Sequence, residues 1–265
     1  MLGMVSIMSV GSVMKRTLVV YGSTGLIGRE VVKQARECGY STIGIARTSN
    51  KFCDVNYSVD FLDFDRLQLV TNEVLTNGNE PVSIVFCHRS RDLSSVGRSQ
   101  IERFRHELDI TLNPYIATET TISKLACDAQ INIVTVTSNA GAAYAQDTRY
   151  SYQVVKAAQI SAACGLAYSS SISLGVYSNI VLFGEAIDEN RQTHDEYHSR
   201  LFEELRRQNG GRPVATVKNI GRIVMLLCAA DKLAVNGQEI IVDGGISKVT
   251  QESIVRSSIA RQAEF

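Results

Sequence analysis

The stretch RYSYQVVKAA, residues 149–158, places two tyrosines close to a single lysine. Residues four apart share one face of a helix, so Tyr152 and Lys156 can approach each other, whereas Tyr150 points elsewhere. A free phenol has a pKa of about 10, and a nearby ammonium favours the phenolate. The spacing therefore predicts that Tyr152 and Lys156 form a general acid/base pair that exchanges a proton with a substrate.

A serine stands fourteen residues before Tyr152, at the end of the apolar run in VTVTSNAG. Ser138 closes a predicted strand, so its hydroxyl would lie at the edge of a sheet. There it could donate a hydrogen bond to a substrate oxygen and stabilise the charge that develops on it. Ser138 is therefore the third candidate catalytic residue.

Three glycines lie three residues apart in YGSTGLIGRE, where the predicted strand 17–21 leads into a helix that runs to Gly39. A turn without β-carbons allows backbone N–H groups and a helix N-terminus to approach a pyrophosphate. A tight turn that binds no ligand is the alternative. The predicted cofactor contacts in this turn are Gly22, Ser23, Thr24, Gly25, Leu26, Ile27 and Gly28.

An arginine follows the second predicted strand, in GIARTSN. In dinucleotide-binding folds an acid at this place accepts from the ribose 2′-hydroxyl, whereas an arginine binds a 2′-phosphate. Arg47 therefore favours NADP, with NAD as the alternative, although a solvated surface arginine fits the same residue. Asp60, at the end of the third predicted strand, is expected beside the adenine edge.

Apolar runs and helical patterns alternate along the chain, which is typical of a parallel sheet covered by helices on both faces. The sequence predicts an α/β fold with a doubly wound, Rossmann-like parallel sheet in a single domain over 15–265, after an N-terminal extension over 1–14. The predicted strands are 17–21, 41–46, 57–61, 82–86, 131–137, 172–182 and 239–243, and the predicted helices are 26–38, 65–75, 97–129 with a bend near Pro114, 149–168 and 216–230.

Composition excludes several classes of function. Lys+Arg and Asp+Glu balance at 27 each, so no overall charge attracts nucleic acid or an anionic membrane, and no apolar run is long enough to span a bilayer. The six cysteines form no CxxC pair, which indicates reduced thiols and a cytoplasmic protein. His194 and His198 lie four apart without evident further ligands, so we expect no metal site.

The glycine turn, Ser138, Tyr152-x-x-x-Lys156 and GQEIIVDGG (237–245) together resemble the short-chain dehydrogenase/reductase family, over roughly residues 16–246. The resemblance implies that Tyr152 is the acid/base and that Ser138 positions the carbonyl or hydroxyl. It also implies that Lys156 holds the nicotinamide ribose and helps the tyrosine to release its proton. The segment NIVLFGEAID (179–188) is similar to a cofactor-binding segment of the family, which implies cofactor contacts at Gly184 and Ala186.

Three features depart from the family pattern. The glycine spacing is that of the extended, nucleotide-sugar-modifying branch, whereas the chain length is that of the shorter reductases. The family's Asn-Asn-Ala-Gly is replaced by CHRS, which brings Cys87 and His88 to the cofactor ribose and lets His88 or Arg89 contact a phosphate or the substrate. The asparagine of the family's proton relay aligns with Thr111, and Asn113 stands two residues away.

The leading hypothesis is an NADP-dependent oxidoreductase that transfers a hydride between the nicotinamide and a carbonyl or secondary alcohol carbon of a small molecule. The alternatives are a nucleotide-sugar epimerase or dehydratase, and a non-catalytic protein that senses a dinucleotide. We expect a homodimer or homotetramer, from the resemblance and from the apolar stretch IIVDGGISKV. The polar segment 193–207 is expected to form a helix that covers the substrate.

Overall fold

A single seven-stranded sheet organises the protein, and all of its strands run parallel in the order β3-β2-β1-β4-β5-β6-β7. This confirms the predicted doubly wound fold. The computed structural model describes residues 16–76, 82–90, 99–125, 130–143, 148–169, 175–189, 195–229 and 235–262, so the predicted extension over 1–14 lies outside these ranges. The strands are β1 (Thr17–Tyr21), β2 (Ser41–Ala46), β3 (Val55–Ser58), β4 (Val82–Phe86), β5 (Gln130–Ser138), β6 (Gly175–Phe183) and β7 (Glu239–Ile241).

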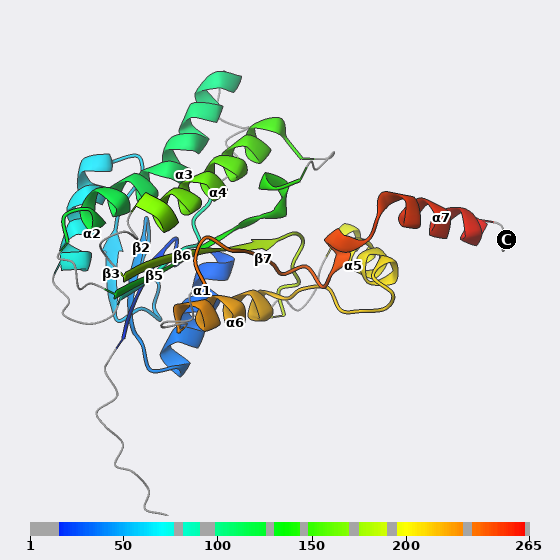
Figure 1. The fold of residues 1–265 in the computed structure, drawn as a ribbon, viewed down its shortest axis with the longest axis horizontal. Helices are drawn as coiled ribbons and strands as arrows, with labels where there is room; N and C mark the ends of the chain where they lie inside the picture. Colours follow the sequence, from blue (N-terminus) through cyan, green and yellow to red (C-terminus); the bar gives the residue numbers. More distant parts are fainter. Residues whose placement is uncertain are drawn as a thin grey trace, which may run out of the picture.

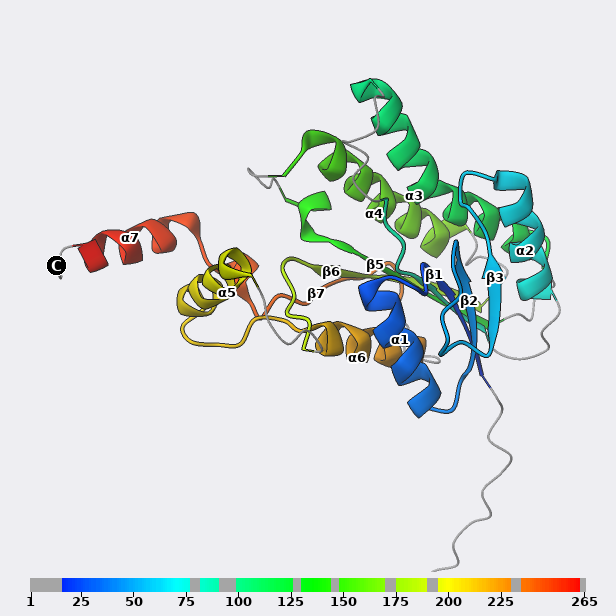
Figure 2. The same ribbon diagram turned by 180° about the vertical axis from the view of Figure 1, so that it is seen from behind.

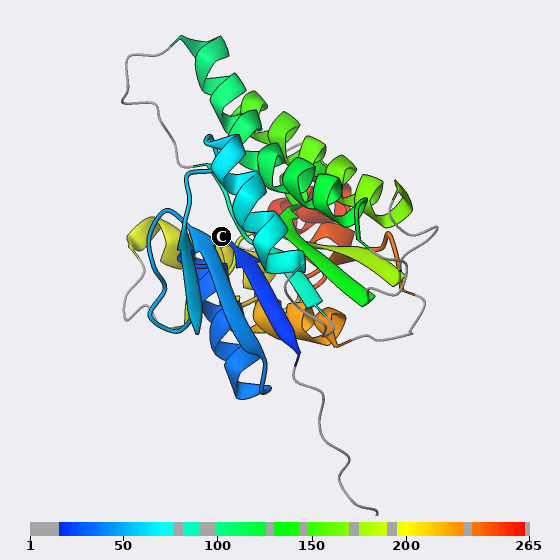
Figure 3. The same ribbon diagram turned by 90° about the vertical axis from the view of Figure 1, so that its left-hand side faces the viewer.

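Helices cover both faces of the sheet, as Figures 1 and 3 show. Helices α2, α3 and α4 lie on one face, and α1 and α6 lie on the other. The helices are α1 (Leu26–Glu37), α2 (Phe64–Thr76), α3 (Gln100–Ile122), α4 (Tyr150–Ser169), α5 (Glu196–Gln208), α6 (Val217–Cys228) and α7 (Gln251–Gln262), with short 3-10 turns η1 (Asn139–Gly141) and η2 (Ile246–Lys248). Within the ranges that the structure describes, no helix is both long and apolar enough to cross a bilayer.

The sheet has a hydrophobic core on each face because successive side chains of a strand point to opposite sides. In β1, Val19 and Tyr21 face the cluster under α2, α3 and α4, whereas Leu18 and Val20 face the cluster under α1 and α6. All four side chains are almost completely buried. Burial of an aliphatic side chain contributes about 1.5–3 kcal/mol, so central strands of this kind stabilise the fold strongly.

The third strand lies two to three residues earlier than predicted. It begins at Val55 and ends at Ser58, because the chain then enters a turn in which Asp60 Oδ1 accepts a hydrogen bond from the Leu62 N–H at 3.1 Å. Aspartate favours such turns by bonding the backbone two residues on. Asp60 therefore lies beyond the strand, in a turn at the outer edge of the sheet.

The last strand is also shorter than predicted. It ends at Ile241, and the Asp243 carboxylate accepts from the N–H groups of Gly245 and Ser247, which turns the chain into η2. Helix α7, which the sequence did not predict, then stands clear of the sheet in both Figures 1 and 2.

The long helix α3 runs through Pro114 as one element, where the sequence predicted a helix over 97–129 with a bend. It begins at Ser99 in a capping box, in which Ser99 Oγ accepts from the Glu102 N–H and the Glu102 carboxylate accepts from the Ser99 N–H. The predicted ends of this helix fall partly on residues outside the described ranges.

Candidate functional site

The carboxyl ends of β1 and β4 mark the place where the winding of the sheet reverses. Strand β1 pairs with β2 on one side and with β4 on the other, and Tyr21 lies opposite Phe86. Connections from these two strands leave in opposite directions, which opens a crevice where doubly wound proteins bind ligands. Strand β5 continues three residues beyond this level and ends at Ser138.

Two positions of the glycine turn have no room for a β-carbon. A Cβ on Gly22 would lie 2.6 Å from the His88 Cα, and Gly22 also has a φ of +81°. A Cβ on Gly28 would lie 2.3 Å from the Gly22 carbonyl oxygen. Gly25 is the N-cap of α1 and supplies no side-chain cap, so no side chain of the N-cap accepts from the first-turn N–H groups of this helix. These features suit a bound pyrophosphate.

The side chains of this turn point in different directions. Ser23 is fully buried, and its Oγ faces the backbone of Gly44. A contact between Ser23 and a cofactor would therefore involve its backbone. Ile27 packs against the core cluster under α1, whereas Leu26 is exposed and Thr24 is half-buried.

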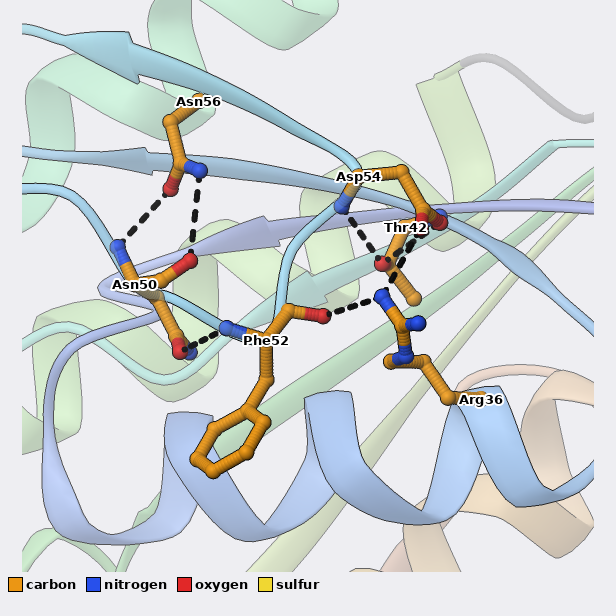
Figure 4. A network of polar contacts seen from close by, with 6 residues as sticks. All are labelled: Arg36, Thr42, Asn50, Phe52, Asp54 and Asn56. Carbon is orange, nitrogen blue, oxygen red and sulfur yellow. Dashed lines mark hydrogen bonds and ion pairs between the residues drawn. The ribbon is translucent and has the colours of Figure 1, made fainter.

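The loop after β2 carries Arg47 and is tied to the glycine turn. Asn50 Nδ2 donates to the Ser23 carbonyl at 2.8 Å, and the Asn50 N–H donates to Asn56 Oδ1 at 2.8 Å. Further bonds link this loop to Thr42 and to Arg36 through Asp54 (Figure 4). Arg47 itself is exposed at the end of β2. Arg47 thus stands, exposed, on a loop that is hydrogen-bonded to the glycine turn.

The structure brings Tyr152 and Lys156 together at the start of α4. Lys156 Nζ lies over the Tyr152 ring, 5.6 Å from its centroid, whereas Tyr150 is 80% exposed. The turn that begins at Ser138 packs against this helix, because a Cβ on Gly141 would lie only 2.6 Å from the Lys156 carbonyl carbon. Ser138 Oγ accepts from the Ala140 N–H at 3.2 Å, which leaves its own hydrogen free to be donated.

The Lys156 ammonium is buried and held by a residue that the sequence analysis missed. Lys156 is 5% exposed, and its Nζ donates to Gln159 Oε1 at 2.9 Å. Burial, and secondly the positive charge of Arg89, lower the pKa of Lys156 to about 8. Gln159 follows the lysine by three residues in a helix rich in alanine, so helical spacing could have identified it.

His88 points into the core cluster under α3. Its Nε2 hydrogen-bonds the Thr111 carbonyl at 2.9 Å, and its ring lies edge-on to Phe61 at a centroid distance of 5.2 Å. Burial is the main cause that lowers the pKa of His88 to about 4, so the imidazole is neutral at physiological pH. The Thr111 carbonyl, at the predicted relay position, thus already has His88 as a partner, and Asn113 Nδ2 donates to the Phe61 carbonyl at 2.7 Å.

The remaining predicted residues lie along the same edge of the sheet. Burial raises the pKa of the Cys87 thiol, which packs against the cluster under α1 and α6. Gly184 follows β6, and a Cβ there would lie 3.0 Å from Asn139 Nδ2. Ala186 is half-buried against the same cluster as Cys87.

The predicted covering segment forms α5, which begins at its N-cap Asp195. His198 Nδ1 lies 2.7 Å from Asp195 Oδ1, and His194 lies outside the described ranges. In the part of the chain that the structure describes, no three His, Cys, Asp or Glu side chains are grouped as metal ligands would be.

Solved structures with the same fold are similar to the chain at low sequence identity. An oxidoreductase of the short-chain dehydrogenase/reductase family from Brucella ovis, in complex with a partially ordered NAD, has 20% identity and a TM-score of 0.65 over 86% of this chain and 99% of its own. Aldohexose dehydrogenase from Thermoplasma acidophilum has 16% identity and a TM-score of 0.70 over 90% and 96%. A short-chain dehydrogenase from Leptospira borgpetersenii with bound NAD+ has 16% identity and a TM-score of 0.67 over 88% and 93%.

No curated protein sequence matches the chain. The family model described as enoyl-(acyl carrier protein) reductase matches residues 83–247, which is more than half of the chain and includes Ser138, Tyr152 and Lys156. The parallel sheet, the glycine turn and this match lead to one conclusion: the chain belongs to the short-chain dehydrogenase/reductase family of oxidoreductases.

Proposed function

We propose that the protein is an NADP-dependent oxidoreductase that interconverts a carbonyl and a secondary alcohol on a small molecule, with Tyr152 as general acid/base. The observation that carries the proposal is the position of the Lys156 ammonium over the Tyr152 ring, beside the turn that begins at Ser138. A structural helix pair would not require a lysine that is 5% exposed, because burial of an ammonium is costly.

The nicotinamide of the bound cofactor would supply or accept the hydride. The proton transfers fall to this chain. When a carbonyl is reduced, the Tyr152 hydroxyl donates its proton to the substrate oxygen, and when an alcohol is oxidised, the phenolate takes that proton back. The Ser138 hydroxyl donates a hydrogen bond to the same oxygen. The positive charge of Lys156 stabilises the phenolate.

The proposal is tested by assaying the protein with a panel of compounds and following the nicotinamide absorbance. The panel contains aldohexoses, other aldehydes, ketones and secondary alcohols. A substrate-dependent change in reduced cofactor is the expected result. A substrate that is isomerised or dehydrated without net change in the cofactor would instead support an epimerase or dehydratase. Binding of the cofactor without turnover of any member of the panel would support a sensor.

Arg47 is expected to select NADP, because it is exposed at the end of β2 on a loop anchored to the glycine turn. A charge-assisted contact to a 2′-phosphate contributes roughly 1.5–3 kcal/mol. We expect Arg47→Asp to lower the ratio of NADP to NAD affinity by at least about tenfold, as measured by fluorescence titration of both reduced cofactors. Arg222→Asp, on an exposed position of α6, is the control and should leave the ratio unchanged. An unchanged ratio in Arg47→Asp would refute the role of this arginine.

Arg89 is expected to contact a phosphate of the cofactor or an acidic group of the substrate. It is exposed, directly follows His88 at the crevice, and its positive charge acts on Lys156. Two cations at one site are unfavourable unless an anion lies close to both. This arrangement is consistent with a ligand that carries negative charge.

A homodimer or homotetramer is expected because apolar side chains are exposed near the C-terminus. Ile241 on the edge strand β7 is 39% exposed, and Val255 and Ile259 on α7 are 55% and 60% exposed. Light scattering at micromolar concentration should give a dimer or tetramer, and Val255→Asp with Ile259→Asp should shift the protein toward smaller species. Leu69→Asp, at a position 63% exposed on α2, is the matched control. A monomeric wild-type protein would contradict the expectation.

A further inference from the structure

Gln159 is a fully buried polar residue that contacts the Lys156 ammonium directly. Lys156 Nζ donates to Gln159 Oε1 at 2.9 Å, and the two residues lie three positions apart on the inner face of α4. A buried ammonium destabilises the folded protein unless an acceptor compensates for the lost water. The contact therefore determines where the ammonium lies.

The orientation of the Gln159 amide is set by two more hydrogen bonds. Thr137 Oγ1 donates to Oε1 at 2.7 Å, and Nε2 donates to the Tyr115 hydroxyl at 3.1 Å. The Tyr115 hydroxyl in turn donates to Thr135 Oγ1 at 3.1 Å. A reversed amide would direct its NH₂ group at the ammonium, so that two donors would face each other. The carbonyl end of the amide is therefore the end that holds the lysine.

We propose that Gln159 is a positioning residue of the site, an inference that rests on the proposed function: its side-chain carbonyl anchors the Lys156 ammonium on the side of the sheet. An ammonium has three N–H donors, so two remain for the cofactor ribose and the phenolic oxygen. The bonds of Gln159 lead inward to Thr135 and Thr137 on β5, which are at most 1% exposed. This network therefore holds the lysine and offers no proton path to solvent.

The groups around Lys156 explain why a neutral amide matters there. His88, from the end of β4, is neutral because burial lowers its pKa to about 4. Arg89, from the same segment, is positive and opposes the ammonium. On α3, burial raises the pKa of Tyr115, so its hydroxyl stays neutral, and on α4 the Tyr152 ring lies 5.6 Å away. His88, Arg89 and Tyr115 supply no negative charge here, so the Gln159 amide oxygen is the acceptor that favours the charged lysine.

Two substitutions of similar size test the anchor in opposite directions. Gln159→Glu puts a carboxylate against the ammonium and should raise the titration midpoint of Lys156 by about one pH unit or more. Gln159→Leu removes the acceptor and should lower that midpoint. The midpoint is measured by NMR of the lysine side chain in the protein without cofactor, with Lys156→Met to assign the signal. The alkaline limb of kcat/KM should follow the same two directions.

The control is Thr135→Val, which removes a buried hydrogen bond of the same network without touching Lys156 or Gln159. It should leave the lysine midpoint unchanged, even if it lowers the melting temperature. A midpoint in Gln159→Glu equal to that of the wild type would overturn the proposal, and this variant decides alone if Gln159→Leu does not fold. If the midpoints shift as expected but the wild type transfers no hydride, the proposed function fails while the anchor stands.

Discussion

Replacement of Tyr152 by phenylalanine should lower kcat by about 10²-fold or more, the size of a typical general acid/base contribution. The substitution keeps the ring over which Lys156 Nζ lies and removes only the hydroxyl that would carry the transferred proton. Cofactor affinity should therefore survive almost unchanged. Turnover is followed at the nicotinamide absorbance, and cofactor affinity is measured by fluorescence titration without substrate.

Tyr150 provides the matched control, because it is two residues away on the same helix and 80% exposed. Tyr150→Phe should change turnover by no more than about two- to threefold, the effect expected of a hydroxyl that contacts no reacting atom. If Tyr150→Phe is the damaging change, or if Tyr152→Phe keeps full activity, the assignment of the acid/base is wrong.

Replacement of Lys156 by methionine should lower both kcat and cofactor affinity, each by about tenfold or more. In the proposed mechanism the ammonium would stabilise the phenolate and hold the nicotinamide ribose, so both quantities should respond. Without it the phenol gives up its proton less readily, so the acidic limb of the pH–rate profile for alcohol oxidation should move to higher pH. The two effects are separated by cofactor titration and by kcat measured across pH.

The loss of activity in Lys156→Met should not come from unfolding. Methionine fills a similar volume, the cost of burying an ammonium disappears, and Gln159 Oε1 still accepts from Thr137. The melting temperature should therefore not fall. Lys33→Met, at an exposed position of α1, is the control and should be fully active. Wild-type kcat together with wild-type cofactor affinity in Lys156→Met would rule out both roles of the lysine.

The central strands could be predicted from sequence because burial on both faces leaves a nearly continuous apolar run. VSIVF, for example, predicts β4 with the bounds that the structure has. The apolar pattern does not predict where a strand ends when a side chain bonds the local backbone, as Asp60 does after β3 and Asp243 does after β7. The pattern also does not predict α7, because the apolar residues of this helix do not pack on the core and leave no clear helical period.

At the site, helical spacing was sufficient to pair Tyr152 with Lys156, because both residues belong to one element. It could not predict the environment of Gln159, which depends on Thr137 from β5 and Tyr115 from α3. The sequence placed His88 beside the cofactor, and it could not show that the His88 ring turns toward Thr111 and Phe61, since the residue follows the last paired position of β4. Contacts between distant segments arise only when the chain is packed.

The clash that a side chain at Gly22 would make with the His88 backbone has a consequence for protein engineering. The obstacle at 2.6 Å is a main-chain atom, so no change of rotamer can remove it. A graft of another protein's turn into residues 22–28 must therefore keep glycine at position 22. A library over residues 22–28 that leaves position 22 free would carry this clash in every member without glycine there, whereas a library that fixes Gly22 avoids it.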